Sequence, residues 1–293
     1  MNPNTLLSQR TDFLFRSDAF DLDAYFRRVG YSGNGTATLE TLRELQFRHP
    51  EAIAYENLDA LLGRAISLEA SALERKLVQS DRGGHAFEHN ILFGNVLHHL
   101  GFSIRGLCAR GRFQVPADRP TGRDHMLLLV EMPDGPYIVD VGFNGLGPTA
   151  PLRLMPDVVQ ATPREEYRLL PFGTALELQV RLGNHWQALY QFDLSPQVQA
   201  DFEVINYYMS SHPHSNLTNA LHVGRVDGAT RYRLHNSLLA VHLRDGTIKQ
   251  RKLEHAGAIL ATLKEVFRIA VPDDPALLSR LAQFCDPYDA TVG

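Results

Sequence analysis

Apolar residues in the first hundred positions recur every three or four residues, which is the spacing of one face of a helix. The segment 20–31 has this pattern and stops near Gly30. A second helix is predicted over 36–50, where Thr38 can act as the N-cap and Pro50 ends the pattern.

The helical spacing returns in 68–80, and again in 87–102 after the pair Gly83-Gly84. The last of these segments is apolar on two faces, with Leu92, Phe93, Val96 and Leu100 on one and Phe87 and Ile91 on the other. Such a pattern is typical of a helix that is buried on most sides. We expect this helix to end at Gly101.

From about residue 104 the apolar residues fall into short segments rich in β-formers and separated by turn residues. Strands are expected at 104–115, 125–132, 137–143, 167–172, 176–182, 186–194 and, with a turn at Asp245-Gly246, within 232–253. Helices are expected at about 200–210, 256–269 and 275–285.

This order of helices, strands and a mixed segment is typical of an α+β fold. We expect an N-terminal helical bundle over 1–100 and a central antiparallel β-barrel or sheet over 101–205. A crossing helix and a C-terminal α/β lid are expected over 206–293.

The composition excludes several classes of function. The 293 residues carry a net charge of -4, which argues against nucleic-acid binding. No stretch approaches the roughly 18 apolar residues of a membrane span, and the N-terminus lacks the apolar segment of a signal peptide. Two cysteines, Cys108 and Cys285, make no disulfide framework, so we expect a cytoplasmic protein with reduced thiols. A monomer and a homodimer are both compatible with the sequence.

The segment RGGHAFEHN, residues 82–90, contains the spacing H-x-x-E-H of the inverted zinc peptidases. On a helix, His85 and His89 would lie one turn apart, beside Glu88, and could share a metal ion. A catalytic zinc needs a third protein ligand, and nothing downstream repeats that family's pattern. We expect no metal and keep the zinc site as an alternative.

His125 and Asp140 form a second candidate group. An Asp inside an apolar strand is costly unless it has a partner, and a His bonded to it would have its tautomer fixed, as in nucleophile–His–Asp triads. If the turn between them centres on Asp134-Gly135, hairpin register pairs Asp140 with about Leu129, so contact with His125 needs irregular pairing. The alternative is an Asp bonded to backbone and an exposed His.

Five motifs of the chain resemble the arylamine N-acetyltransferase family in order and spacing. They are YENLD (55–59), RGGHAFEHN (82–90), HMLLLVE (125–131), VDVGFNG (139–145) and SSHPHS (210–215). In that family the second motif reads R-G-G-x-C-F-E-x-N. The resemblance runs from about residue 20 to the C-terminal helices. It implies acetyl transfer from acetyl-CoA, as co-substrate, to arylamines or hydrazines in xenobiotic metabolism. The route would be a ping-pong mechanism through a cysteine thioester.

The resemblance also implies a Cys-His-Asp triad arranged as in cysteine proteases, with Ala86 at the position of the cysteine and His125 and Asp140 as the other members. A cysteine at position 86 would lie where a helix begins, and the helix dipole favours a thiolate there. His125 would lower the pKa of that thiol further. Arg82 and Glu88 are expected to brace the loop, and the glycine pair could supply oxyanion donors.

Other positions carry over from the same resemblance. Tyr55, Phe143 and Tyr208 match or neighbour aromatics of the acceptor pocket, although ordinary core packing is the alternative for each. Thr121 and Gly122 lie in a segment that touches the coenzyme in relatives. Asn144 replaces the usual Gly of V-G-F-G-G, a change that would alter the pocket floor.

Alanine offers no nucleophile, so the thioester route is closed in this chain, and neither Cys108 nor Cys285 has a motif around it. We favour a variant disabled by a Cys-to-Ala change, because an abandoned site has no reason to keep a buried His–Asp pair. A natural homologue that lost catalysis and binds acyl-CoA or aryl ligands is one alternative. A macrolactam-forming amide synthase, which shares the triad, is another.

Overall fold

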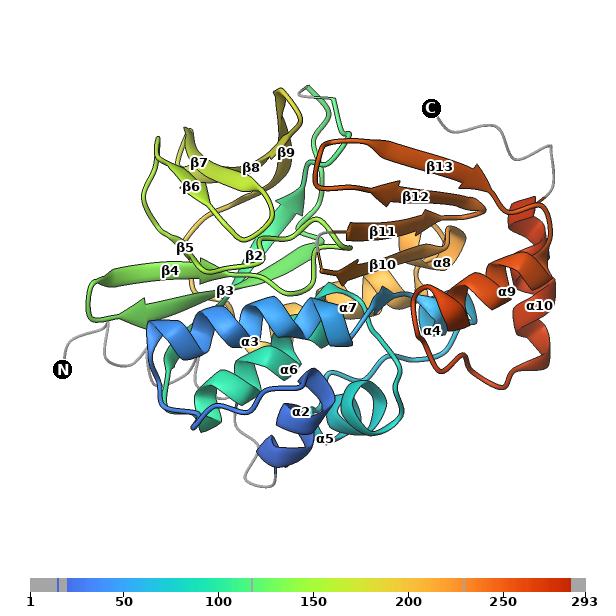
Figure 1. Ribbon diagram of the computed structural model, residues 1–293, viewed down its shortest axis with the longest axis horizontal. Coiled ribbons are helices and arrows are strands. Elements are labelled where there is room, and N and C mark those ends of the chain that lie inside the picture. Colours follow the sequence, from blue (N-terminus) through green and yellow to red (C-terminus); the bar gives the residue numbers. More distant parts are fainter. Residues whose placement is uncertain (1–14, 16–19, 117, 229, 286–293) are drawn as a thin grey trace.

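The structure is a computed structural model that describes residues 15, 20–116, 118–228 and 230–285. N-terminal helices precede an eight-stranded antiparallel sheet, and a five-stranded antiparallel sheet with further helices completes the described chain (Figure 1). The α+β fold predicted from the sequence, with helices, a central barrel-like sheet and a C-terminal α/β part, is therefore confirmed.

The N-terminal helices are α2 (Leu22–Val29), α3 (Leu39–Ala52), α4 (Leu58–Leu61), α5 (Ala70–Leu73) and α6 (Ala86–His99). Gly30 ends α2 in the left-handed conformation at φ 68°, which glycine adopts without a Cβ clash. Thr38 caps α3 as predicted, because its side chain accepts a hydrogen bond from the Thr41 N–H.

Two of the predicted helices differ in the structure. α3 continues past Pro50 to Ala52, because a proline in the last turn removes one hydrogen bond while Ile53 still donates to the His49 carbonyl. The segment 68–80 is helical, but its second half, Glu74–Gln79, is a π-helix. The apolar spacing of a short segment does not distinguish these two helix types.

α6 is the central helix of the N-terminal part. Every residue from Ala86 to Leu97 is buried, so the prediction of burial on most sides is confirmed. The helix packs against β2 and β3 on one side and against α2 and α5 on the other. Its N-terminus therefore lies where the helices meet the central sheet.

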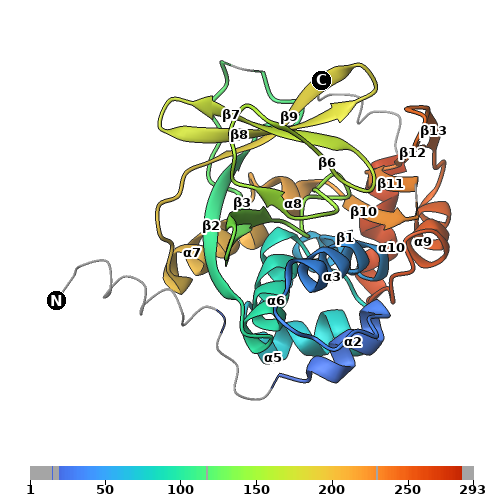
Figure 2. The ribbon, with the colours of Figure 1, turned by 60° about the vertical axis from the view of Figure 1, so that its left-hand side comes forward.

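The central sheet has the strand order β5-β4-β3-β2-β9-β8-β7-β6 and curves into a nearly closed barrel (Figure 2). Its strands are β2 (Ser103–Gly111), β3 (His125–Met132), β4 (Gly135–Val139), β5 (Leu152–Arg153), β6 (Val159–Ala161), β7 (Glu166–Phe172), β8 (Ala175–Leu182) and β9 (His185–Phe192). Apolar residues of these strands fill the inside, among them Leu127, Leu169 and Leu189.

The β3–β4 hairpin corrects the predicted register. Met132 pairs with Gly135 and Leu128 with Val139, so the loop is Pro133-Asp134 and the ladder ends one residue before Asp140. Continuing the ladder sets Asp140 opposite Leu127, and His125 is then its diagonal neighbour on the same face. Contact between the two needs no irregular pairing.

The C-terminal part contains α7 (Gln199–Ser211), α8 (Asn216–Asn219), β10 (His222–Asp227), β11 (Thr230–His235), β12 (Leu238–His242), β13 (Ile248–Lys252), α9 (Ala256–Glu265), α10 (Pro275–Ala282) and the 3₁₀ turn Gln283–Cys285. Its sheet has the order β1-β10-β11-β12-β13, where β1 is Tyr55–Glu56. The N-terminal segment thus contributes an edge strand to the C-terminal sheet, and the predicted boundary at 205 falls inside α7.

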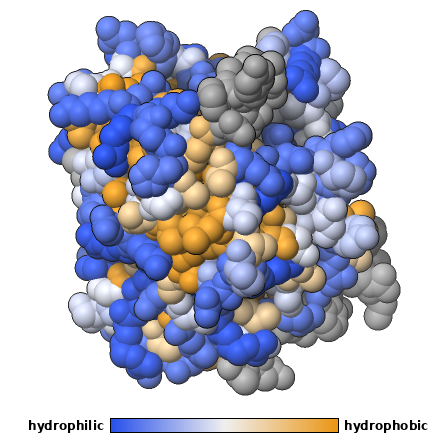
Figure 3. Space-filling model, turned by 90° about the vertical axis from the view of Figure 1, so that its right-hand side faces the viewer, coloured by the Kyte–Doolittle hydropathy of each residue, from blue (hydrophilic) through white to orange (hydrophobic). Residues whose placement is uncertain are grey.

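The C-terminal core leaves several apolar side chains only partly covered, among them Leu62, Leu260, Val266 and Val271. Apolar surface is visible on the side of the molecule where α9 and α10 lie (Figure 3). None of the helices in the described ranges is long and apolar enough to cross a membrane.

Candidate active site

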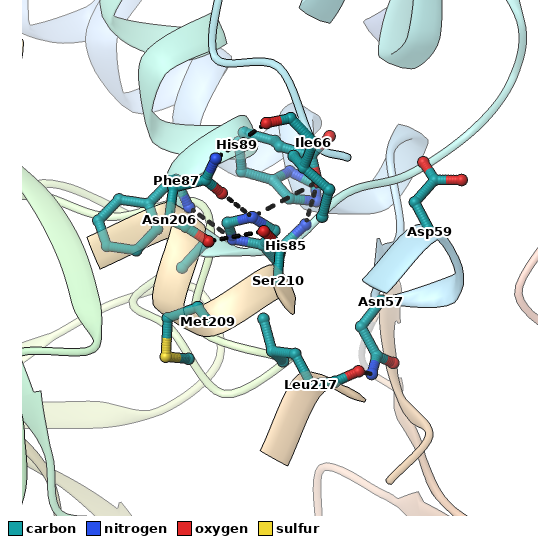
Figure 4. Close-up of polar contacts among 12 residues, drawn as sticks. Asn57, Asp59, Ile66, His85, Phe87, His89, Asn206, Met209, Ser210 and Leu217 are labelled. Atoms are coloured by element: carbon teal, nitrogen blue, oxygen red, sulfur yellow. Dashed lines mark hydrogen bonds and ion pairs between the residues drawn. The ribbon is translucent and has the colours of Figure 1, made fainter. Parts of the chain in front are cut away.

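The N-terminus of α6 is fixed by the side chain of His85. Nδ1 of His85 accepts from the Phe87 N–H (3.3 Å), and the Glu88 carboxylate accepts from the His85 N–H (2.9 Å). Nε2 of His85 donates to Oδ1 of Asn206 (3.0 Å), whose amide donates to the Ile66 carbonyl (2.9 Å). Figure 4 shows the imidazole directed at Asn206 of α7. This network assigns His85 as the neutral Nε2–H tautomer.

The glycine pair before α6 is required by close packing. A Cβ on Gly83 would lie 2.0 Å from the Ala54 carbonyl oxygen, and one on Gly84 would lie 2.7 Å from the Glu88 carboxylate. The space that the missing side chains leave is therefore filled by protein atoms, not kept open for a ligand.

Charged side chains brace the loop that leads into α6. Arg82 pairs with Glu56 (2.7 Å) and Asp59 (3.1 Å), while Lys76 pairs with Asp59 (2.6 Å) and Glu88 (2.7 Å). Burial alone would raise the pKa of Asp59, but the cations of Lys76 and Arg82 lower it below its usual value. Arg82 and Glu88 thus form ion pairs that hold the loop in place.

His125 and Asp140 form a buried hydrogen-bonded pair. Nε2 of His125 donates to Oδ2 of Asp140 at 2.7 Å, and the two residues are 4% and 1% exposed. Burial alone would raise the pKa of Asp140, but the charge of His125 and hydrogen bonds from His125, the Gly142 N–H and Asn90 lower it. The bond fixes the imidazole orientation and leaves Nδ1 for a second partner.

Asn90 joins this pair to the start of α6. Its Nδ2 lies 3.1 Å from Oδ1 of Asp140, 2.8 Å from the Met126 carbonyl and 3.2 Å from the Ala86 carbonyl. The side-chain Oδ1 of Asn90 in turn accepts from the Val141 N–H (3.2 Å). Asn90 was not among the site residues predicted from the sequence, although it closes the RGGHAFEHN motif one helical turn after Ala86.

Ala86 is the first residue of α6 and is 6% exposed. A Cβ on Gly142 would lie 2.9 Å from the Ala86 Cα and 2.8 Å from Nδ2 of Asn90. Gly142 follows Asp140 by two residues, so the backbone just after Asp140 packs directly against the first residue of α6. Position 86 and the His125–Asp140 pair therefore belong to one site.

Two aromatic rings enclose the His125 imidazole. Phe143 meets it edge-on with ring centroids 5.0 Å apart, and the Tyr190 centroid lies at 4.9 Å. Tyr190 was missed by the sequence analysis, because an apolar strand residue gives no sign of its partner. Its hydroxyl is buried beside Asp140, and burial, the charge of Asp140 and a hydrogen bond to Asp140 raise its pKa.

The remaining predicted positions lie on three different elements. Tyr55, on β1, bridges to Gly84 and stacks on His89 with centroids 6.3 Å apart. Tyr208 is 48% exposed on α7 and stacks on His212 (4.4 Å). Their roles stay predictions.

Thr121 and Gly122 lie in the loop between β2 and β3. The Thr121 carbonyl accepts from Arg110 (2.6 Å), and its hydroxyl is buried with no partner among the described residues. Gly122 is exposed.

The histidines of the zinc alternative have protein partners on both ring nitrogens. Nε2 of His89 donates to the Ala54 carbonyl (3.1 Å), and its Nδ1 accepts from Nε2 of His49 (2.8 Å). His49 accepts in turn from the Tyr25 hydroxyl (2.9 Å). Within the described ranges, no group of three or more His, Cys, Asp or Glu side chains is placed to hold a metal ion. The geometry does not favour zinc at His85, Glu88 and His89.

Comparison with known proteins gives consistent matches over most of the chain. A sequence profile described as N-acetyltransferase matches residues 38–276. Arylamine N-acetyltransferase of Escherichia coli K12 is 39% identical over 254 residues, covering 86% of this chain and 90% of that protein. The enzyme of the same name from Mycobacterium tuberculosis H37Rv is 42% identical over 259 residues, covering 87% and 91%.

The fold agrees with these matches. The solved structure of Mycobacterium marinum arylamine N-acetyltransferase in complex with CoA is 40% identical in sequence and superposes with a TM-score of 0.87. The superposition covers 91% of this chain and 100% of that one. On sequence and on structure, the chain belongs to the arylamine N-acetyltransferase family.

Proposed function

We propose that this site transfers an acetyl group from acetyl-CoA to arylamines or hydrazines, with position 86 as the place of acyl attachment. The observation that carries the proposal is the 2.7 Å bond between His125 and Asp140 beside the first residue of α6. The relatives are arylamine N-acetyltransferases, and one of them has been solved with CoA. The same chemistry here would use a thiol at position 86.

With cysteine at position 86, Nδ1 of His125 takes the thiol proton and the N-terminus of α6 stabilises the thiolate. The thiolate attacks the acetyl carbonyl of acetyl-CoA, the new C–S bond forms, and the CoA thiolate leaves with a proton from His125. The amine then attacks the enzyme thioester, gives up a proton to His125 and releases the enzyme thiol. Asp140 holds the imidazole throughout.

In the chain as it stands, Ala86 has no group that can carry the acetyl. Cys108 does not replace it, because burial raises the pKa of its thiol to about 12. Burial also raises the pKa of Cys285. We therefore infer that this sequence is an inactive form of an acetyltransferase. Only the nucleophile at position 86 is missing, because His125, Asp140 and Asn90 are all present.

Substrate contacts follow from the surroundings of this frame. The exposed backbone at Gly122 is available to the coenzyme, whereas the Thr121 hydroxyl is buried and would bind it only after a local rearrangement of the loop. Phe143, beside His125, and Tyr55, beside Gly84, are available to an aromatic acceptor. Tyr208 would contact the acceptor only if its ring leaves the stack on His212.

Restoring the thiol tests the proposal. Ala86→Cys is expected to gain one acetyl group by intact mass after exposure to acetyl-CoA, and to release CoA continuously when an arylamine or hydrazine is added. Ala60→Cys, a second buried alanine, is the matched control and should gain none. A folded Ala86→Cys protein that stays unacetylated would remove the acyltransferase assignment and leave a ligand-binding role.

A further inference from the structure

Tyr55 and Arg233 flank Gly224 in one cross-strand row of the C-terminal sheet. Gly224 pairs with Tyr55 of β1 on one side and with Arg233 of β11 on the other. Directly opposed residues of antiparallel strands point to the same face. The Cα atoms of Tyr55 and Arg233 are then about 10 Å apart, with no side chain between them.

This row faces the loop that follows Asp140. A Cβ on Gly224 would lie 2.6 Å from Oδ1 of Asn144 and 2.8 Å from the Gly145 nitrogen. Phe143, in the same loop, contacts His125, and Tyr55 bridges to Gly84, two residues before position 86. The face that carries Arg233 thus borders the candidate active site.

Arg233 is a half-buried cation without an anionic partner among the described residues. Its guanidinium lies over the Phe113 ring at 4.6 Å, and its buried Nε has no hydrogen-bond partner among the described residues. No ion pair to a carboxylate of the described chain is formed by this guanidinium. Burial and the nearby Arg231 lower the pKa of Arg233 to about 10, so the side chain is charged at neutral pH.

Arg231, two residues earlier on the same face, is an arginine whose guanidinium is bonded to protein groups, and it serves as a comparison for Arg233. It pairs with Glu165 (2.7 Å) and donates to the Gly147 carbonyl (3.3 Å) and the Tyr167 hydroxyl (3.2 Å). A guanidinium withdrawn from water needs such partners. The Arg233 guanidinium instead packs on the Phe113 ring, and its N–H groups make no hydrogen bond to the described residues.

Resting on the proposed acetyl transfer, we propose that Arg233 binds an anionic substituent of the acceptor, specifically a carboxylate carried by an aromatic amine. A carboxylate would accept the unused guanidinium hydrogen bonds. Phe113 and Tyr55 would contact the aromatic part of the same ligand. The acceptors that this chain prefers are then aminobenzoate-like amines, and Arg233 is the residue that selects them.

Direct binding to the unmodified protein tests this without any turnover. The probes are 4-aminobenzoate and its neutral isostere 4-aminobenzamide, measured by titration calorimetry against the parent chain, Arg233→Gln and the control Arg251→Gln on exposed β13. We expect Arg233→Gln to weaken 4-aminobenzoate about tenfold or more. Binding of the amide should stay within about threefold, and Arg251→Gln should change neither affinity.

Three results would overturn the inference. They are equal losses for both probes, unchanged binding of 4-aminobenzoate, and a loss confined to CoA in a parallel titration, which would assign the cation to the coenzyme phosphates. Because Ala86→Cys is assayed separately, an inactive thiol variant would refute the proposed reaction while leaving the carboxylate discrimination by Arg233 intact.

Discussion

Nδ2 of Asn90 lies 3.1 Å from Oδ1 of Asp140, so a side chain of α6 holds the carboxylate that orients His125. The same amide reaches the carbonyl of Ala86. Asn90 therefore fixes the position of Asp140 relative to the first residue of α6. Its removal should affect catalysis beyond any effect on folding.

We expect Asn90→Ala, made in the Ala86→Cys protein, to lower kcat/KM by about tenfold or more and stability by about 1 to 3 kcal/mol, since buried partners lose their hydrogen bonds. Asn95→Ala is the matched control on the same helix, because Asn95 is buried and, within the described part of the chain, its side chain donates only to the Ile91 carbonyl. It should cost similar stability and leave kcat/KM unchanged. Equal kinetic losses in both variants would contradict a positioning role for Asn90.

Tyr190 places its ring against His125 and its buried hydroxyl beside Asp140, where burial, the charge of Asp140 and a hydrogen bond to Asp140 raise the pKa of the hydroxyl. Removing a hydroxyl that donates to a buried carboxylate takes a hydrogen bond from that carboxylate, so Tyr190→Phe should lower the free energy of unfolding by about 1 to 3 kcal/mol. Tyr190→Ala removes the ring as well and should cost about 3 to 5 kcal/mol. Urea denaturation measures both, and an unchanged free energy of unfolding in Tyr190→Phe would mean that the hydroxyl does not bond to Asp140.

The buried histidines predict acid lability. Burial lowers the pKa of His85 to about 3 and that of His89 to about 4, and it lowers the pKa of His49 well below its usual value. The unfolded chain binds these protons near pH 6.5 and the folded chain does not. Stability is therefore complete above pH 6.5 and falls as the pH drops toward 4, by about 2 kcal/mol per histidine at pH 5.

Urea titrations at pH 7 and pH 5 measure this fall. In His85→Gln the difference between the two pH values should shrink by about 2 kcal/mol, because one of the protons is no longer taken up on unfolding. His185→Gln, which replaces an exposed histidine of β9, should keep the full difference. If both variants behave alike, His85 does not stay neutral in the folded state.

Arg231 connects the C-terminal sheet to the barrel through Glu165 at 2.7 Å, with its side chain 3% exposed. Removing one partner of a buried pair leaves the other charge uncompensated, so Arg231→Met should cost about 3 to 5 kcal/mol. The exposed pair Arg181–Glu166 is the control, and Arg181→Met should cost less than about 1 kcal/mol. Comparable losses in the two variants would show that burial does not govern this pair.

Much of the fold was predictable because its helices and long strands carry a clear period. The failures have local causes. β10 was missed because Gly224 and the buried Arg225 break the alternation of a strand, and Arg225 is accommodated by the carbonyls of Glu51 and Val266. β1 has two residues, which is too short for any period.

Part of the site was predictable from the residues, because an Asp inside an apolar strand needs a partner such as His125. The family motifs singled out position 86, His125 and Asp140, and the structure brings all three to the start of α6. Asn90 lies in the RGGHAFEHN motif, but its role depends on its contact with Asp140, 50 residues further along the chain. Arg233 lies in none of the five motifs. The predicted register of Asp140 was wrong by two residues, since it depended on which residues form a tight turn.

β1 also has a consequence for the biosynthesis of the protein. Glu56 donates its N–H to the Gly84 carbonyl, and Tyr55 and Glu56 pair with β10. The loop that enters α6 is thus anchored to a strand that leaves the ribosome much later. A stalled or prematurely terminated product would lack that anchor, so a reactive thiol at position 86 would be assembled only in chains whose synthesis has passed β10.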